Sequence, residues 1–194
     1  MSVILPAAPG DILAVSTGTG WQETIIKLGS WLGGKPAPVN HVIGITHQDA
    51  QGRWIGLQGQ PGGVGLVDCT PFLAMPQTRT NHAQPRLNDQ GQLIALLASA
   101  AKTIGVQYDW VGIAEDAAID LRDTDLSAWL NKLYSWPPSN GQLPGDVVCS
   151  SLWAALYDLP QVGWAHPDLG AERVCQPADW WHWSDQAQWT GKAA

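Results

Sequence analysis

Cysteine is scarce in this chain, which limits how the fold can be held together. The 194 residues include three cysteines, Cys69, Cys149 and Cys175, an odd number with no C-x-x-C spacing. This pattern argues against both a disulfide framework and a zinc ribbon. The sequence therefore predicts a fold that depends on its apolar core, with no metal site and no cofactor.

Charged residues and long apolar runs are also limited. Only 14% of the residues are charged, and the net charge is -7, which argues against nucleic acid or an anionic membrane surface as the main partner. No apolar run approaches the length of a membrane span, and the first residues lack the pattern of a secretion signal. We expect a protein without an integral membrane segment, made as a soluble protein in the cytoplasm.

What the chain does contain is enough apolar material for one core. Hydrophobic residues make up 45% of the sequence, and 194 residues suit one ordinary domain. No stretch reads as a linker, so residues 1–194 are predicted to form a single domain. Its core is expected at about residues 9–158, followed by a tryptophan-rich extension at about 159–194. The composition includes twelve tryptophans and one phenylalanine.

Hydrophobic periodicity predicts a mixture of strands and helices. Strands are expected at residues 12–15, 40–47, 53–58 and 64–67, with the second and third forming a hairpin. Helices are expected at residues 21–32 and 89–104. Residues 71–85 suggest a helical turn at 72–75 and then an edge strand, and residues 111–133 suggest a broken helix. The pattern indicates an α+β protein with a small antiparallel sheet packed against helices.

Residues 144–157 are the stretch with the clearest chemical meaning. Pro144 and Gly145 interrupt any regular secondary structure before them, and Asp146 can cap a helix. The apolar residues that follow have helical spacing: Val148, Leu152, Ala155 and Leu156. Cys149 is thus predicted in the first turn of a buried helix, where unpaired N–H groups and the helix dipole favour a thiolate. The alternative is a buried structural cysteine.

Four short motifs resemble those of NlpC-type papain-like cysteine peptidases. Residues 9–13 and 40–45 resemble the "PGDLV…HVGIY" element of that family, and residues 105–110 and 148–152 resemble its "GxPYxWGG…DCSGLV" element. Here the histidine element precedes the cysteine element. This order is similar to the circularly permuted branch, which includes YiiX-like and lecithin–retinol-acyltransferase-like proteins. The resemblance covers roughly residues 9–158 and implies a circularly permuted papain-like fold.

The resemblance also implies roles for particular residues. Cys149 would be the nucleophile, and His41 would be the base that takes its proton. Gln58 would orient the imidazole, although the YiiX-like group often has a carboxylate there, and Gln60 is the near alternative. Tyr108 would help to form an oxyanion hole together with the backbone N–H of the nucleophile.

Several other polar or reactive residues have simpler interpretations. His47 shares strand parity with His41, so alternation by itself does not choose between the two histidines. Asp11 and Asp146 fit turn and cap positions, and Cys69 and Cys175 fit structural roles. The cluster Trp180–Trp183 could stack on a sugar or line a groove, but packing of the tail onto the core is the favoured interpretation.

These observations predict a cysteine hydrolase, a peptidase or amidase that forms an acyl-enzyme. By resemblance, its expected substrate is a peptidoglycan stem peptide. Two alternatives remain open: a lipid acyltransferase or thioesterase on the same fold, and a non-catalytic binding or assembly protein. Because cell wall lies outside the membrane and no secretion signal is evident, the first function implies export by another route, such as a phage or a secretion apparatus.

Overall fold

The computed structural model describes residues 7–18, 21–32, 35–60, 62–81, 90–108, 146–147, 149–159, 162, 164–165, 177–184 and 190–191. The elements follow in the order β1 (Ile12–Val15), α1 (Trp21–Leu32), β2 (His41–Gln48), β3 (Trp54–Gln60), β4 (Gly63–Asp68), α2 (Thr70–Leu73), β5 (Arg79–Thr80), α3 (Gln90–Ala101), β6 (Gln107–Tyr108), β7 (Asp146–Val147), α6 (Cys149–Asp158), β8 (Trp164–Ala165), α7 (Pro177–Trp183) and β9 (Thr190–Gly191). The helix predicted at residues 111–133 lies outside the described residues.

The main sheet is antiparallel, with the strand order β4-β3-β2-β1-β5. Two smaller pairs accompany it: β6 with β7, which is parallel, and β8 with β9, which is antiparallel. The predicted hairpin is present as β2 and β3, and the predicted edge strand is present as β5. The α+β class and the small antiparallel sheet are therefore confirmed.

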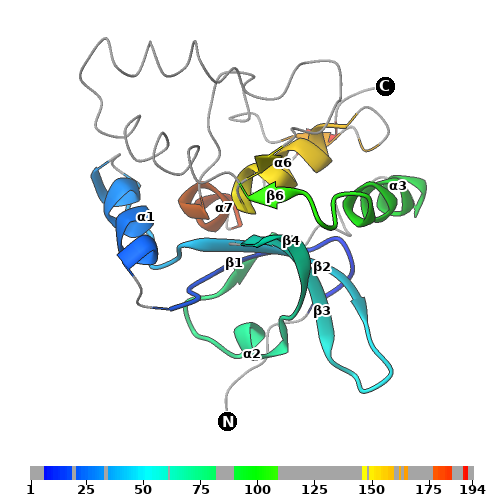
Figure 1. The fold of residues 1–194 in the computed structure, drawn as a ribbon, viewed down its shortest axis with the longest axis horizontal. Coiled ribbons are helices and arrows are strands. Elements are labelled where there is room, and N and C mark those ends of the chain that lie inside the picture. Colours follow the sequence, from blue (N-terminus) through cyan, green and yellow to red (C-terminus); the bar gives the residue numbers. More distant parts are fainter. Residues whose placement is uncertain are drawn as a thin grey trace.

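Side chains along each strand alternate between two apolar cores. Ile12 and Ala14 of β1 belong to a core that also contains side chains of α3, α6 and α7. Leu13 and Val15 belong to a second core, which includes Leu73 of α2. Figure 1 shows the corresponding layers, with α3, α6 and α7 on one side of the sheet and α2 on the other. Burial on both faces explains why β1 reads as a continuous apolar run.

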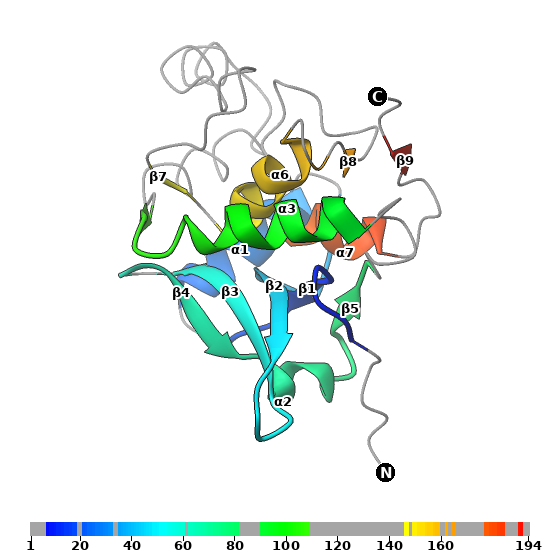
Figure 2. The same cartoon turned by 90° about the vertical axis from the view of Figure 1, so that its right-hand side faces the viewer.

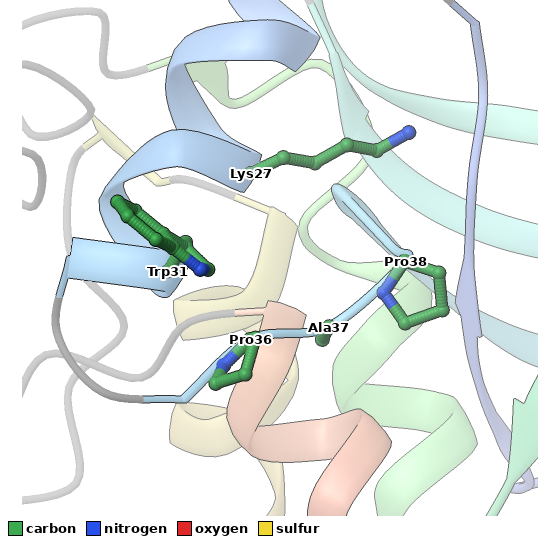
Figure 3. A pocket seen from close by; sticks show the side chains of 5 residues that line it. All are labelled: Lys27, Trp31, Pro36, Ala37 and Pro38. Carbon is green, nitrogen blue, oxygen red and sulfur yellow. The ribbon is translucent and has the colours of Figure 1, made fainter.

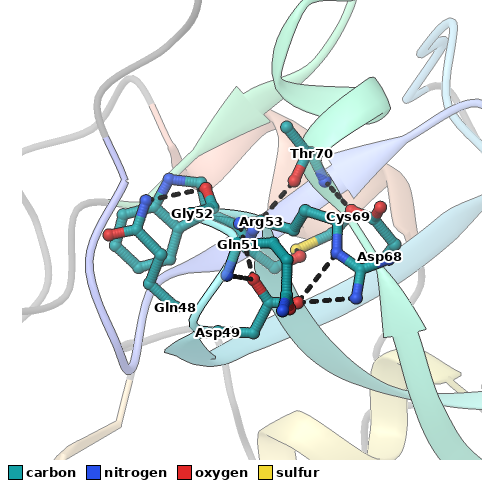
Figure 4. Close-up of polar contacts among 9 residues, drawn as sticks. Gln48, Asp49, Gln51, Gly52, Arg53, Asp68, Cys69 and Thr70 are labelled. Atoms are coloured by element: carbon teal, nitrogen blue, oxygen red, sulfur yellow. Dashed lines mark hydrogen bonds and ion pairs between the residues drawn. The ribbon is translucent and has the colours of Figure 1, made fainter.

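The turn between β2 and β3 fixes the register of this hairpin. The Asp49 carboxylate accepts hydrogen bonds from the backbone N–H groups of Gln51 and Arg53, each at 2.9 Å, and from Arg53 Nε at 2.8 Å. Nearby, Thr70 Oγ1 accepts the Trp54 N–H at 2.8 Å (Figure 4). The turn lies beside α2 and away from α6 (Figure 2). It therefore holds the register of two strands whose opposite ends carry His41 and Gln58.

Helix α6 packs against the middle of the sheet. Its side chains from Leu152 to Tyr157 are all buried. Trp153 Nε1 donates to the Leu57 carbonyl oxygen at 3.2 Å, and the Tyr157 hydroxyl donates to the Gly10 carbonyl oxygen. A Cβ atom added to Gly44 would lie 2.0 Å from Trp153 Cζ2. The indole thus lies directly against the backbone of β2, which sets the position of the whole helix.

Helix α3 is shorter than its apolar pattern predicts. It ends at Ala101, whereas the expected helix runs to residue 104. The backbone N–H and the hydroxyl of Thr103 both donate to the Ala100 carbonyl oxygen, at 3.0 and 2.7 Å, which tightens the last turn. Gly105 follows with a φ of 87° and donates its N–H to Val64 of β4. This tertiary bond draws the chain away from the helix axis.

Candidate functional site

Cys149 is the first residue of α6, as its sequence context predicts. Its side chain is 3% exposed. Backbone hydrogen bonds from Val42 and Ser150 lower the pKa of its thiol, as bonds donated to a thiolate do. The Ser150 N–H belongs to the first turn of α6, where backbone N–H groups have no partner within the helix. The Val42 N–H belongs to the sheet, so Sγ bridges the two layers.

The pairing of the strands explains why the Val42 N–H can reach the sulfur. Ile45 donates its backbone N–H to Asp11 on the β1 side of β2. Because N–H groups alternate in direction along a strand, Val42 directs its N–H toward β3. The β2–β3 ladder runs from Gly44, opposite Leu57, to Gln48, opposite Trp54. Val42 lies before this paired part, and its N–H is available to Cys149.

His41 is the first residue of β2 and is 8% exposed. Its Nε2 atom lies 2.7 Å from Gln58 Oε1. Gln58 Nε2 in turn donates to Gln60 Oε1 at 2.6 Å. An amide oxygen only accepts hydrogen bonds, so this arrangement requires the proton of a neutral imidazole to be on Nε2. Nδ1 then remains as the nitrogen that can accept a proton from Cys149.

The two reactive side chains influence each other's ionisation. Burial by itself raises the pKa of the Cys149 thiol, but the charge of His41 and a hydrogen bond between the two side chains lower it. The net pKa is lower than the usual value of 9.0. The site excludes most water, since Gln58 is only 7% exposed, and a poorly hydrated site strengthens the attraction between thiolate and imidazolium. The arrangement is suited to nucleophilic chemistry at sulfur.

The structure brings three of the four predicted site residues together and describes only the backbone of the fourth. Cys149, His41 and Gln58 form a continuous hydrogen-bonded series, with Gln60 one step further out. The backbone of Tyr108 pairs with Val147, two residues before Cys149. The Tyr108 side chain is outside the described part of the structure. Its expected role in an oxyanion hole therefore stays a prediction.

His47 does not share the environment of His41, contrary to the parity expected from alternation. A bulge shifts the β2–β3 register between Ile45 and His47. An extra residue in one strand of a pair breaks the two-residue period, so side chains on either side of it no longer share a face. His47 is exposed, and its Nδ1 contacts the Thr46 hydroxyl at 3.0 Å.

The remaining cysteines and the tryptophan cluster have different surroundings. Cys69 is buried, its Sγ donates to the Trp54 carbonyl oxygen at 3.1 Å, and burial raises the pKa of its thiol to about 12. Cys175 and the side chain of Asp146 lie outside what the structure describes. The Asp11 carboxylate accepts the N–H of Ala8 at 2.9 Å, which fits the expected turn role.

The tryptophans of α7 pack against the start of α6. Trp180 and Trp183 are 1% and 3% exposed and belong to the same core as α6. Trp180 Nε1 donates to the Ser150 carbonyl oxygen at 3.2 Å, and the Arg79 guanidinium lies 3.5 Å from the centre of the Trp181 ring. The Trp180 contact holds the first turn of α6, and therefore Cys149, while α7 itself also packs against β1.

Sequence reasoning missed the residues that hold the site together. Nothing in the motifs assigns a role to the N–H of Val42, to the space at Gly44 or to Trp153. A glycine within a β-branched strand is a signal of close approach by another group. That signal does not say which group approaches, because Gly44 and Trp153 are 109 positions apart (153 minus 44) and meet only in the folded chain.

Replacement of Gln58 tests its contact with His41. We expect Gln58→Ala to slow alkylation of Cys149 about 10- to 100-fold, because a hydrogen bond to a charged group contributes about 1.5–3 kcal/mol. Gln58→Glu should stabilise the imidazolium, since a carboxylate favours the cation, and the neighbouring Cys149 thiolate should then persist, and be alkylated, to lower pH. The measurement is the alkylation rate between pH 5 and 9.

The matched control for Gln58 is Gln60→Ala. The Gln60 side chain contacts Gln58 rather than His41, and the residue is exposed, so its loss should change the rate less than Gln58→Ala does. An equal or larger effect of Gln60→Ala would instead make Gln60 the residue that orients the imidazole.

Comparison with models of known protein families and with curated proteins finds no match for this chain. In the described part of the structure, no group of three or more His, Cys, Asp or Glu side chains converges in a way that could hold a metal ion. Among the described helices, none is both long and apolar enough to cross a membrane.

Proposed function

We propose that this chain is a cysteine hydrolase that cleaves an amide bond through an acyl-enzyme. The observation that carries the proposal is the series Cys149–His41–Gln58, in which a thiol of lowered pKa at a helix start meets an imidazole that is oriented by an amide. A buried structural cysteine does not need such a partner, and Cys69 has a carbonyl oxygen instead.

The first half of the reaction acylates the sulfur. His41 Nδ1 accepts the Sγ proton, and the thiolate attacks the carbonyl carbon of the amide, so that its oxygen becomes an oxyanion. The backbone N–H of Cys149 and the hydroxyl of Tyr108 are the proposed donors to that oxygen. The imidazolium then gives its proton to the departing amine, and the C–N bond breaks to leave a thioester on Cys149.

The second half restores the enzyme. His41 takes a proton from water as the water oxygen attacks the thioester carbon. Collapse of the second oxyanion breaks the C–S bond, the imidazolium returns its proton to the sulfur, and a carboxylic acid leaves. Gln58 holds the ring in one orientation and one tautomer through both halves. As a neutral amide it does not offset the charge of the imidazolium, which keeps the imidazolium a stronger acid toward the leaving amine.

The narrower proposal concerns family and substrate. The permuted motif order, the α+β fold and the small antiparallel sheet support a circularly permuted papain-like, NlpC-type hydrolase of the YiiX-like group. For such a protein the peptide bonds of peptidoglycan stems are the proposed substrate, with export or phage-associated delivery to the wall. A shared fold does not determine the substrate. An experiment is needed to identify it.

Release of new amino groups from purified peptidoglycan sacculi is the direct test of this function. We expect wild-type protein to release them, and Cys149→Ala and His41→Ala to reduce the rate at least about 10³-fold, since nucleophile and base act as a unit. Each variant should unfold at a temperature close to that of the parent, which the same samples can verify.

Other outcomes would replace this proposal. Transfer of an acyl group from a phospholipid or thioester, without amine release, would favour a lipid acyltransferase or thioesterase. A stable protein whose Cys149 is inert toward every substrate and alkylating agent would favour a binding or assembly role.

A further inference from the structure

A pocket lies beside α1, near the strand end that carries His41. Its volume is about 310 Å³, and it is lined by Lys27, Trp31, Pro36, Ala37 and Pro38. Figure 3 shows Lys27 and Trp31 projecting from α1, opposite the segment that contains the two prolines. Residues 36–38 are close in sequence to His41, which begins β2.

Two sets of contacts tie this pocket to the candidate site. Lys27 Nζ donates to Ser16 Oγ at 2.8 Å, and Ser16 follows Val15, the residue paired with His41. Asn40 and Thr17 exchange two hydrogen bonds of 3.1 Å across the same strand ends. The ammonium of Lys27 is therefore held beside the backbone that positions the base.

The chemistry of the pocket combines rigid apolar walls with one cation. Trp31 is 63% exposed although its indole is large and apolar, and proline rings add stiff apolar surface. Lys35, at the start of the same segment, is neutralised by Asp179 at 2.5 Å. Lys27 has a hydroxyl partner instead, and no carboxylate among the described side chains pairs with it. A hydroxyl does not offset the positive charge of an ammonium, and the ligand that complements this charge is a carboxylate.

We propose that this pocket is a substrate subsite for a peptide segment that bears a free carboxylate, next to the amide that Cys149 attacks. Lys27 binds the carboxylate, and Trp31 with the prolines covers the aliphatic part of the segment. The inference rests on the proposed function, because it supplies the substrate class for the same site. Such a subsite would select the substrate by one end, away from Cys149, which is itself only 3% exposed.

Binding to the full-length Cys149→Ala protein tests the subsite separately from turnover. The probes are soluble stem peptides released from purified sacculi, and the same peptides after their carboxylates are converted to neutral amides. Calorimetry should show tighter binding of the free carboxylates. Lys27→Met should remove that preference, with about a tenfold loss for the free carboxylates and little change for the amides. Lys27→Arg should restore most of it.

Two further variants complete the test. Trp31→Ala should weaken both probe forms about equally, because it removes apolar contact and no charge. Lys102→Met, which removes an exposed positive charge just after α3, should change neither. The proposal is overturned if the parent binds neither probe, or if Lys27→Met keeps the preference for carboxylates. A preference that depends on Lys27, in a protein that never cleaves the peptides, would retain the subsite and reject the hydrolase.

Discussion

Limiting iodoacetamide near pH 6 should alkylate Cys149 at least about 50-fold faster than Cys69 in the folded protein. The pKa of Cys69 is raised to about 12, so about one Cys69 thiol in 10⁶ is ionised at pH 6. Any pKa of Cys149 below its usual 9.0 gives more than about one thiolate in 10³. The weaker nucleophilicity of a more acidic thiolate reduces this thousandfold gap by about twentyfold.

The same experiment with His41→Ala isolates the cause of the reactivity. Without the imidazole, burial is the largest influence left on Cys149, and burial raises the pKa of a thiol. The rate of alkylation falls as the pH falls through the thiol pKa, so the midpoint of that decline should move to higher pH in the variant. At pH 6 the lead of Cys149 over Cys69 should largely disappear.

Mass spectrometry of the separate cysteine peptides gives these rates directly. Protein unfolded in denaturant is the control, because every cysteine should then react at a similar rate. If folded wild-type protein alkylates Cys149 no faster than Cys69, the nucleophile is not activated and the hydrolase proposal fails. If the lead persists in His41→Ala, the helix start and the Val42 N–H activate the thiol without the base.

Gly44→Ala should lower the free energy of unfolding by about 3 kcal/mol or more, the upper end of what overpacking costs. The new Cβ would lie 2.0 to 2.4 Å from three atoms of the Trp153 ring. Trp153 is fully buried and its Nε1 is bonded to Leu57, so the ring has little room to retreat. Relief requires that α6 move away from β2, and such a movement separates Cys149 from Val42 and His41.

The loss of stability should therefore be accompanied by a loss of alkylation selectivity. Denaturant unfolding measures the first and peptide mapping measures the second. Gly65→Ala is the matched control, because Gly65 also lies in a strand of the main sheet and nothing is within 4 Å of its added Cβ. That change should stay within about 0.5 kcal/mol of the parent.

A second substitution makes this prediction sharper. Trp153→Leu leaves a cavity and should itself be destabilising. Combined with Gly44→Ala, however, it should cost less than the sum of the two single changes, because the smaller side chain removes the clash. Full additivity, or a stable Gly44→Ala protein, would mean that contact between Gly44 and Trp153 does not position α6.

Local patterns in the sequence predict many of the strands and helices of this fold. The apolar run at residues 12–15 and the β-branched run at 40–47 identify strands, because side-chain alternation and burial are properties of each short segment. The helical spacing after Pro144 and Gly145 correctly places the start of a helix at Cys149. The motif order was sufficient to nominate His41 and Gln58, which the structure brings into hydrogen-bond contact.

Other features depend on groups that meet only when the chain folds. The bulge that separates His47 from His41 arises from pairing with β3, and the end of α3 is set partly by a bond from Gly105 to β4. The lowered pKa of Cys149 needs an imidazole and a backbone N–H from β2, a strand more than 100 residues earlier in the chain. Local propensity carries no information about such distances. The residue types and their partners could thus be read from the chain. The lowered pKa of Cys149 depends on the imidazole and the backbone N–H that tertiary packing brings to it, with Trp153 against Gly44 setting the position of α6.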